Sequence, residues 1–317
     1  MLWLVDYHKA YLIRIFIIKG VIMTFSPNRA RAAVALLVSL FLGGPSLAQI
    51  TIDPEPNPAF AALEAELGLS FGPIVNAETV TVDPLLMNGV EVDDRFFPAI
   101  FGKQRGSDNP TCTATLIGPA TILIAAHCVD DNPRVRFVRD ADVVRSLCVI
   151  APGWRGEVDN GSDIALCLLE RSIRGIPYER VSFDLPRVGQ IAHLTGYGCT
   201  QQGGERDGIL RLGEAPIQNR PPGFRHSPGT LYTVASVAAG QAVLCPGDSG
   251  GPLYVMGGTL DGPRSVIGVN SATTFDRGVS LFAALGAPAN AAFIRSFAEA
   301  RGQQICGVNL ELGCKAS

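Results

Sequence analysis

Short runs of apolar and β-branched residues, separated by glycine, proline and polar residues, fill most of the chain between residues 86 and 285. This pattern is typical of β-strands joined by turns. The chain also contains 35 glycines and 22 prolines, which favour turns. We therefore expect an all-β protein, and 317 residues suffice for one large or two small domains. The clearest strand-like runs are TATLIG, ATILIAAH, RVRFV, DIALCLL, QIAHLTGYG, SVIGVNS and GVSLFAAL.

A helical periodicity replaces the strand pattern near the end of the chain. In residues 287–301 (APANAAFIRSFAEAR), apolar side chains recur at positions 292, 293, 294 and 297. This spacing places them on one face of a helix. We expect one C-terminal amphipathic helix.

Residues 49–85 have a different composition from the rest of the chain. The segment holds no Lys or Arg, and prolines interrupt it. Only residues 59–69 (AFAALEAELGL) show helical spacing. We expect an acidic pro-segment outside the folded core, with a solvated linker as the alternative. Its charged residues are Asp53, Glu55, Glu64, Glu66, Glu78 and Asp83.

Residues 1–48 have the features of an export leader. After Met23 come two arginines, an apolar run and a small-residue cleavage site that ends at Ala48. The apolar run is too short to span a bilayer stably, so we expect no membrane span. Residues 1–22 hold a second apolar patch broken by charges; we expect Met23 to be the true start, with an anchoring extension as the alternative.

Charge and cysteine content narrow the possible functions. The net charge of −3 argues against nucleic acid as the main partner. Eight cysteines without a CxxC pair favour disulfides in an oxidising compartment over a zinc site. No metal or other cofactor is expected. We expect a secreted or periplasmic protein, of bacterial type from its leader.

Three polar residues occupy positions suited to nucleophilic catalysis. Ser249 lies in the glycine-rich stretch CPGDSGGPL, His127 ends the apolar run ILIAAH, and Asp163 begins DIALCLL. A serine nucleophile needs a base and a group that orients the base. Alone, each has an ordinary structural reading, such as a core histidine or a turn aspartate. Their order, His–Asp–Ser, is one that hydrolases use.

The motifs AAHC, DIAL and GDSGGP, together with TCTATLIGPATILIAAHC and the segment GYG at 196–198, resemble the trypsin/chymotrypsin-like serine proteases. The resemblance spans about residues 86–300. It implies two six-stranded antiparallel β-barrels with the active site between them, followed here by the C-terminal helix. The protease domain would then comprise residues 86–317.

The resemblance also implies roles for single residues. Ser249 would be the nucleophile, His127 the general base and Asp163 the residue that orients it. The N–H groups of Gly247 and Ser249 would form the oxyanion hole. Asp248 would pair with the α-amino group of Leu86 once the zymogen is cut.

The expected specificity pocket is apolar. Val243 stands where trypsins carry a pocket-base aspartate, so a preference for Arg or Lys loses its counter-charge. Leu85, before the expected cut, would fit such a pocket. The zymogen would therefore be cut between Leu85 and Leu86 by a protease with apolar preference or by autoactivation. The pocket walls would be formed by Ser271, Thr273 and Gly278.

The resemblance implies a Cys112–Cys128 disulfide beside His127. The family's usual partner of Cys245 is missing, and Cys199 is the best substitute. The other pairs, Cys148–Cys167 and Cys306–Cys314, follow by elimination.

We therefore expect a secreted serine endopeptidase that acts on protein or peptide substrates. The main alternative is a non-catalytic binding protein with the trypsin fold. A narrow processing or toxin-like protease that stays latent until a rare activation is a third reading.

Overall fold

The computed structural model describes residues 16–18, 21–23, 50–69, 88–104, 110–139, 142–158, 160–225 and 227–316. The chain forms two units, Met1–Leu47 and Ala48–Ser317. In the first unit, strands β1 (Phe16–Ile18) and β2 (Val21–Met23) pair in antiparallel fashion. The expected leader cleavage site at Ala48 and the expected activation site at Leu85–Leu86 lie outside the described residues.

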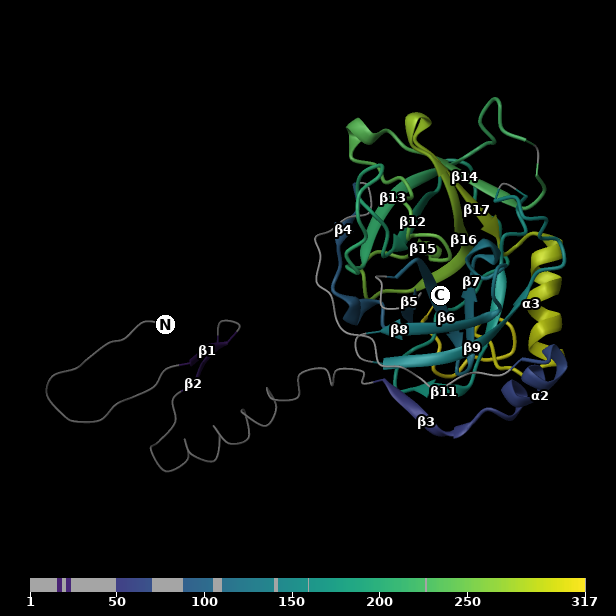
Figure 1. Ribbon diagram of the computed structural model, residues 1–317. Helices are drawn as coiled ribbons and strands as arrows, with labels where there is room; N and C mark the ends of the chain where they lie inside the picture. Colours follow the sequence, from purple (N-terminus) through teal and green to yellow (C-terminus); the bar gives the residue numbers. More distant parts are fainter. Residues whose placement is uncertain are drawn as a thin grey trace, which may run out of the picture. The chain divides into compact units, whose positions relative to one another are not determined.

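Six antiparallel strands in the second unit close into a barrel with the order β10-β7-β6-β5-β8-β9 (Figure 1). Every residue of β6, β7 and β10 is buried, because these strands carry the apolar runs that the sequence marks. The barrel core therefore supports the segments that precede and follow the candidate catalytic residues. The strands are β5 (Ile100–Gln104), β6 (Cys112–Gly118), β7 (Thr121–Ile124), β8 (Arg134–Arg139), β9 (Asp142–Ile150) and β10 (Ala165–Leu169).

A second sheet has the order β12-β15-β16-β17-β14-β13-β4, and pairing between β12 and β13 closes six of its strands into a ring. The short strand β4 extends this ring at β13. The predicted fold class is confirmed. The strands are β4 (Val90–Glu91), β12 (Ile191–Gly196), β13 (Arg211–Gln218), β14 (Thr230–Val234), β15 (Pro252–Met256), β16 (Arg264–Thr274) and β17 (Val279–Ala284).

The expected C-terminal helix is confirmed as α3 (Pro288–Ala300), with Pro288 at its start and Ile294 and Phe297 buried. A proline suits this first position, because its missing N–H would have no partner within the helix. The described residues also include four short 3₁₀ helices: η1 (Asp94–Phe96), η2 (Ala126–Cys128), η3 (Val237–Ala239) and η4 (Phe275–Arg277).

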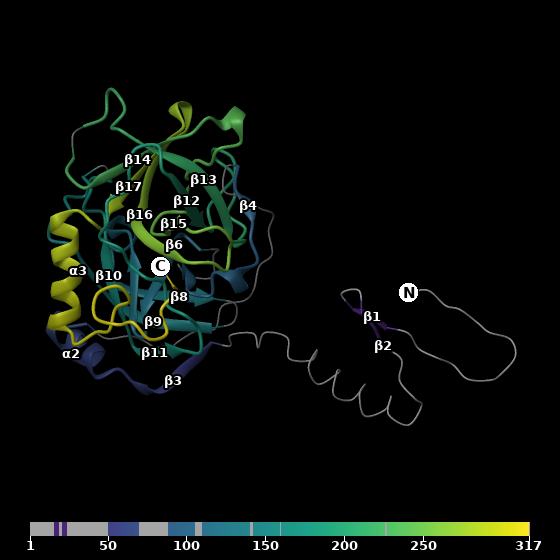
Figure 2. The ribbon, with the colours of Figure 1, turned by 180° about the vertical axis from the view of Figure 1, so that it is seen from behind.

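The acidic segment packs against the first barrel over residues 50–69. Strand β3 (Thr51–Pro56) pairs with β11 (Arg171–Arg174), and helix α2 (Pro58–Leu67) contacts β9 and β10 (Figure 2). Phe60 and Leu63, three positions apart on one helix face, join the barrel core. For these residues, the expectation of a segment outside the core is wrong.

Four disulfides lie in the second unit. Cys112–Cys128 joins the start of β6 to η2, and Cys148–Cys167 joins β9 to β10. Cys199–Cys245 and Cys306–Cys314 complete the set. These are the same four pairs that the sequence led us to expect. No helix in the described part of the chain is long and apolar enough to cross a membrane.

Candidate active site

His127 and Asp163 are held by neighbouring segments of the first barrel. His127 lies in η2, directly after the buried strand β7, and Asp163 lies just before β10, which pairs with β7. The Cys112–Cys128 disulfide anchors η2 to β6. The two apolar runs therefore deliver both side chains to the same end of adjacent strands.

The carboxylate of Asp163 binds His127 through both oxygens. His127 Nδ1 lies 2.6 Å from Asp163 Oδ2, and the His127 backbone N–H donates to Oδ1 at 2.9 Å. Asp163 is completely buried, whereas 24% of the His127 side chain is exposed. An acceptor at Nδ1 favours the tautomer in which Nε2 is free to accept a proton. This geometry suits a general base that faces solvent or substrate.

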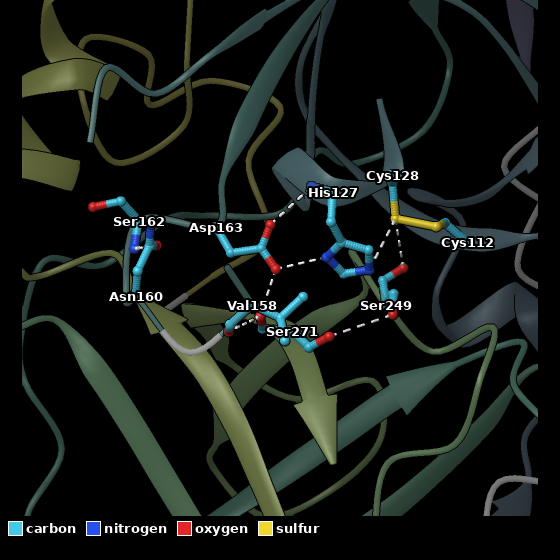
Figure 3. A network of polar contacts seen from close by, with 9 residues as sticks. All are labelled: Cys112, His127, Cys128, Val158, Asn160, Ser162, Asp163, Ser249 and Ser271. Atoms are coloured by element: carbon cyan, nitrogen blue, oxygen red, sulfur yellow. Dashed lines mark hydrogen bonds and ion pairs between the residues drawn. A yellow bond between two sulfur atoms is a disulfide. The ribbon is translucent and has the colours of Figure 1, made fainter. Parts of the chain in front are cut away.

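Ser249 lies on the opposite side of the imidazole from Asp163 (Figure 3). It is half-buried in the turn before β15, and its carbonyl oxygen accepts a hydrogen bond from the Thr113 N–H at 2.8 Å. Its Oγ lies 3.5 Å from the carbonyl oxygen of Ser271. The structure thus brings together His127, Asp163 and Ser249, which are far apart in sequence.

Ser271 forms a hydrogen bond with Asp163, and nothing in the sequence indicated this contact. Its hydroxyl contacts Asp163 Oδ2 and lies 2.7 Å from the carbonyl oxygen of Val158. A hydroxyl that donates to a buried carboxylate stabilises the charge and restricts the orientation of the group. Ser271 was expected as a pocket wall; this contact gives it a direct link to the candidate triad.

Gly247 adopts a backbone conformation that requires glycine. Its φ angle is +107°, and an added Cβ would lie 2.8 Å from Gly198 Cα and from Arg206 Cδ. The Gly247 carbonyl accepts from Thr113 Oγ1 at 2.8 Å. Within the described residues, no backbone carbonyl accepts the N–H of Gly247 or of Ser249. Both donors remain available, as an oxyanion hole needs.

Asp248 is fully buried behind this turn. Its oxygens accept the N–H groups of Gly198 and Cys245, each at 2.8 Å. Burial raises its pKa to about 7, although the two N–H groups and Arg211 oppose the rise. Gly198 must be glycine, because a Cβ there would lie 2.5 Å from the carboxylate. Leu86, the expected partner of Asp248, lies outside the described residues.

The expected pocket residues occupy different environments. Val243 is completely buried in an apolar cluster with Leu244 and Phe282. The hydroxyl of Thr273 donates to the Val279 carbonyl at 3.1 Å. Gly278 has a φ of +59° and ends η4. The buried position of Val243 is therefore apolar and uncharged.

The aromatic ring of Trp154 lies 6.5 Å from the His127 imidazole, between ring centres. Trp154 is partly exposed. The sequence offered no signal for this neighbour, since a lone tryptophan after a strand has no fixed role. Its position makes it a candidate contact for a substrate that reaches His127.

His193 lies in a different part of the structure from the candidate triad. His193 pairs with Glu214 at 3.1 Å and borders a cavity of about 520 Å³ on the second barrel. Among the described residues, the only histidine–cysteine cluster with metal-ligand spacing is His127 with Cys112 and Cys128. Both cysteines are in a disulfide, so neither thiolate is available as a ligand.

Comparison with known proteins identifies the family. The protein-family model described as Trypsin matches residues 86–284, which is more than half of the chain. Chymotrypsin-like elastase family member 1 of Homo sapiens is 29% identical over 211 residues, covering 59% of this chain and 80% of that protein. The same protein of Rattus norvegicus is 30% identical, covering 59% and 78%. Kallikrein-8 of Rattus norvegicus is 31% identical over 170 residues, covering 48% and 64%. The chain therefore belongs to the trypsin family of serine proteases.

Proposed function

We propose that the protein is a secreted or periplasmic serine endopeptidase that hydrolyses peptide bonds through an acyl-enzyme. The observation that carries the proposal is the arrangement of a buried Asp163, a partly exposed His127 and Ser249 around one imidazole ring. Four disulfides in the second unit support a location in an oxidising compartment.

In the first step, Ser249 Oγ attacks the carbonyl carbon of the scissile bond, and His127 Nε2 takes the hydroxyl proton. Asp163 stabilises the imidazolium that forms. His127 then gives the proton to the leaving amine, and water hydrolyses the acyl-enzyme by the reverse sequence of proton transfers. Before substrate binds, the hydrogen bond between a nucleophile and its base is often long. In this resting site, the Ser249 hydroxyl instead lies 3.5 Å from the Ser271 carbonyl oxygen.

The N–H groups of Gly247 and Ser249 serve as the oxyanion hole. They would donate to the oxygen that becomes negative in the tetrahedral intermediate. A preorganised donor of this kind typically contributes about 3–4 kcal/mol to transition-state stabilisation. The positive φ of Gly247 supports this role, because it orients the peptide group without steric conflict.

We propose a preference for apolar residues before the scissile bond. The absence of charge at Val243 supports it, and Thr273 and Gly278 would shape the pocket. The preferred residues would be medium-sized, such as Leu, Val, Met or Ala.

The zymogen would be activated by a cut between Leu85 and Leu86. The new α-amino group of Leu86 would then pair with Asp248. The raised pKa of this buried carboxyl supports the proposal, because a nearby cation would stabilise its ionised form. Either autoactivation or another protease with apolar preference would make the cut.

The first experiment is labelling of purified protein with a fluorophosphonate, followed by mass mapping of the adduct and of the N-terminus. An adduct on Ser249, absent from the Ser249→Ala variant, would establish the nucleophile. Folded protein with a mature Leu86 terminus that takes no adduct would instead indicate a binding protein with the trypsin fold.

A further inference from the structure

Residues 50–69 bind the first barrel through backbone contacts. β3 pairs with β11 in antiparallel register, with Ile52 opposite Ile173 and Thr51 opposite Arg174. β11 pairs with no other strand in the described part of the chain. On its other side, the Ile173 N–H of β11 donates to the Pro119 carbonyl at 2.8 Å. The segment therefore supplies the only strand partner that β11 has among the described residues.

Asn57 connects β3, α2 and the barrel. Its backbone N–H donates to the Glu170 carbonyl at 2.7 Å, and its side-chain amide donates to the Leu169 carbonyl at 3.3 Å. The same side chain accepts the Ala59 N–H and so caps α2. One residue thus fixes the start of the helix on the end of β10.

Apolar contacts hold α2 on the barrel. Leu63 is completely buried and Phe60 is 4% exposed, and both belong to the same core cluster as the strands of the first barrel. Leu67, on the same helix, is 40% exposed. The buried side chains therefore form a directed face, and the core of the barrel includes residues from the acidic segment.

Two ion pairs border this contact. Arg301, which follows α3, binds Glu66 through two hydrogen bonds of 2.5 and 2.9 Å, and Arg174 lies 3.1 Å from Asp53. The C-terminal end of α3 lies beside α2 in both ribbon views (Figures 1 and 2). The acidic segment thus meets basic residues of the body.

We propose that residues 50–69 stay bound to the barrel after the chain is cut, so that the active protease consists of two chains held without a covalent bond. Residues 49–85 contain no cysteine, so no disulfide can retain them. The docking surface comprises β11, the adjoining faces of β9 and β10, and Arg301; its occupant is the segment 50–69 of this chain. This inference rests on the proposed activation cut between Leu85 and Leu86. After that cut, residues 50–69 would be a non-covalent subunit of the enzyme.

The test uses the full chain with Ser249→Ala and a recognition sequence for a site-specific protease inserted among residues 73–85. After cleavage, the sample is analysed by size exclusion in native buffer and by intact mass. We expect the N-terminal fragment to co-elute with the body in equal molar amount and to separate only in denaturant. A fragment that separates in native buffer while the body keeps its circular dichroism spectrum would overturn the proposal.

A matched pair of variants tests the contact itself. Leu63→Asp places a charge in the buried face and should release the fragment after cleavage. Leu67→Asp makes the same change at an exposed position of the helix and should not. Release by both, or by neither, contradicts the assigned surface. If Leu63→Asp does not fold, Asn57→Ala replaces it: the cut fragment should then exchange faster with a labelled peptide of residues 50–69, and an unchanged rate counts against the contact.

This design separates the inference from the proposed function. The engineered site makes the cut independent of any activity of the triad and of any natural cleavage at Leu85–Leu86. Failure of fluorophosphonate labelling would remove the enzyme assignment and leave the docking result intact. Release of the fragment would remove the two-chain enzyme and leave the catalytic assignment intact.

Discussion

Cys199 and Cys245 are joined by a disulfide that ties the segment after β12 to the turn carrying Gly247. The Cys199 N–H also donates to the Pro246 carbonyl at 3.0 Å. The two segments joined by the disulfide also bind the carboxylate of Asp248, which accepts hydrogen bonds from the N–H groups of Gly198 and Cys245. The turn that carries Gly247 is thus held by a disulfide and by hydrogen bonds from the segments around Gly198 and Cys245.

Removing the Cys199–Cys245 disulfide should lower kcat in addition to lowering the stability of the protein. In the variant Cys199→Ser with Cys245→Ser, we expect kcat to fall by about 10–100-fold, less than loss of a whole oxyanion donor, with KM for a small ester nearly unchanged. Affinity for a peptide boronate, which forms a tetrahedral adduct, should fall in parallel.

The control removes the distant Cys306–Cys314 pair by the same substitutions. By loop entropy, the first pair stabilises the protein by about 4 kcal/mol and the control pair by about 2.5 kcal/mol. Both variants should therefore melt at lower temperature, but only the first should lose boronate affinity. Equal boronate affinity in the two variants would refute a positioning role for Cys199–Cys245.

Ser271→Ala should lower kcat with little change in KM. The substitution removes a hydroxyl from the buried Asp163 carboxylate, and a hydrogen bond to a charged group contributes about 1.5–3 kcal/mol. Steady-state kinetics of a p-nitrophenyl ester provide the measurement. Ser271→Thr, which keeps the hydroxyl, should recover part of the rate; no recovery would point to packing instead.

The uncut protein should lose stability as pH rises from about 4 to about 7. Burial raises the pKa of Asp248 from 3.8 to about 7, so the folded state holds this proton more tightly than the unfolded chain does. The favourable contribution is complete below pH 3.8 and is lost as pH rises through 7, and it amounts to a few kcal/mol.

Urea unfolding of the uncut Ser249→Ala chain at several pH values measures this effect, with and without Asp248→Asn. The difference between the two chains isolates Asp248 from other titrating groups. A constant difference across this range would mean that the carboxyl titrates normally. If the α-amino group of Leu86 pairs with Asp248 as proposed, a cut that frees Leu86 should weaken the pH dependence, because a nearby cation lowers the pKa of a carboxyl group.

Leu63→Ala should destabilise the uncut protein by about 2–5 kcal/mol, the usual cost of a cavity in a packed core. Leu67→Ala, the same substitution at an exposed site of α2, should cost much less. Thermal melts of the two variants provide the comparison. Equal melting temperatures would show that α2 does not contribute to the core.

The resemblance of the motifs AAHC, DIAL and GDSGGP to the trypsin/chymotrypsin-like serine proteases implied the two-barrel fold and the candidate triad, and local patterns marked single strands and the C-terminal helix. Buried strands appear as apolar runs, and the serine turn needs glycine at Gly247, where φ is positive. The pattern at residues 59–69 likewise predicted a helix, observed at Pro58–Leu67. Its burial could not be predicted, because a short amphipathic helix does not specify the surface that covers it.

Contacts between residues far apart in the chain could not be predicted from the sequence either. Ser271 contacts Asp163 across 108 positions, and nothing near Ser271 marks that partner. Strand β3 was missed because TIDPEP contains two prolines, which argue against a strand. β3 tolerates them because it lies at the edge of a two-stranded sheet.

The pairing of β3 with β11 has a practical consequence for making the protein. An uncovered strand edge presents unpaired N–H and C=O groups that can pair with another molecule. A recombinant chain that begins at residue 86 would leave β11 uncovered and would expose the apolar surface under Phe60 and Leu63. Such a chain should aggregate during refolding, and adding the peptide 50–69 should restore soluble protein.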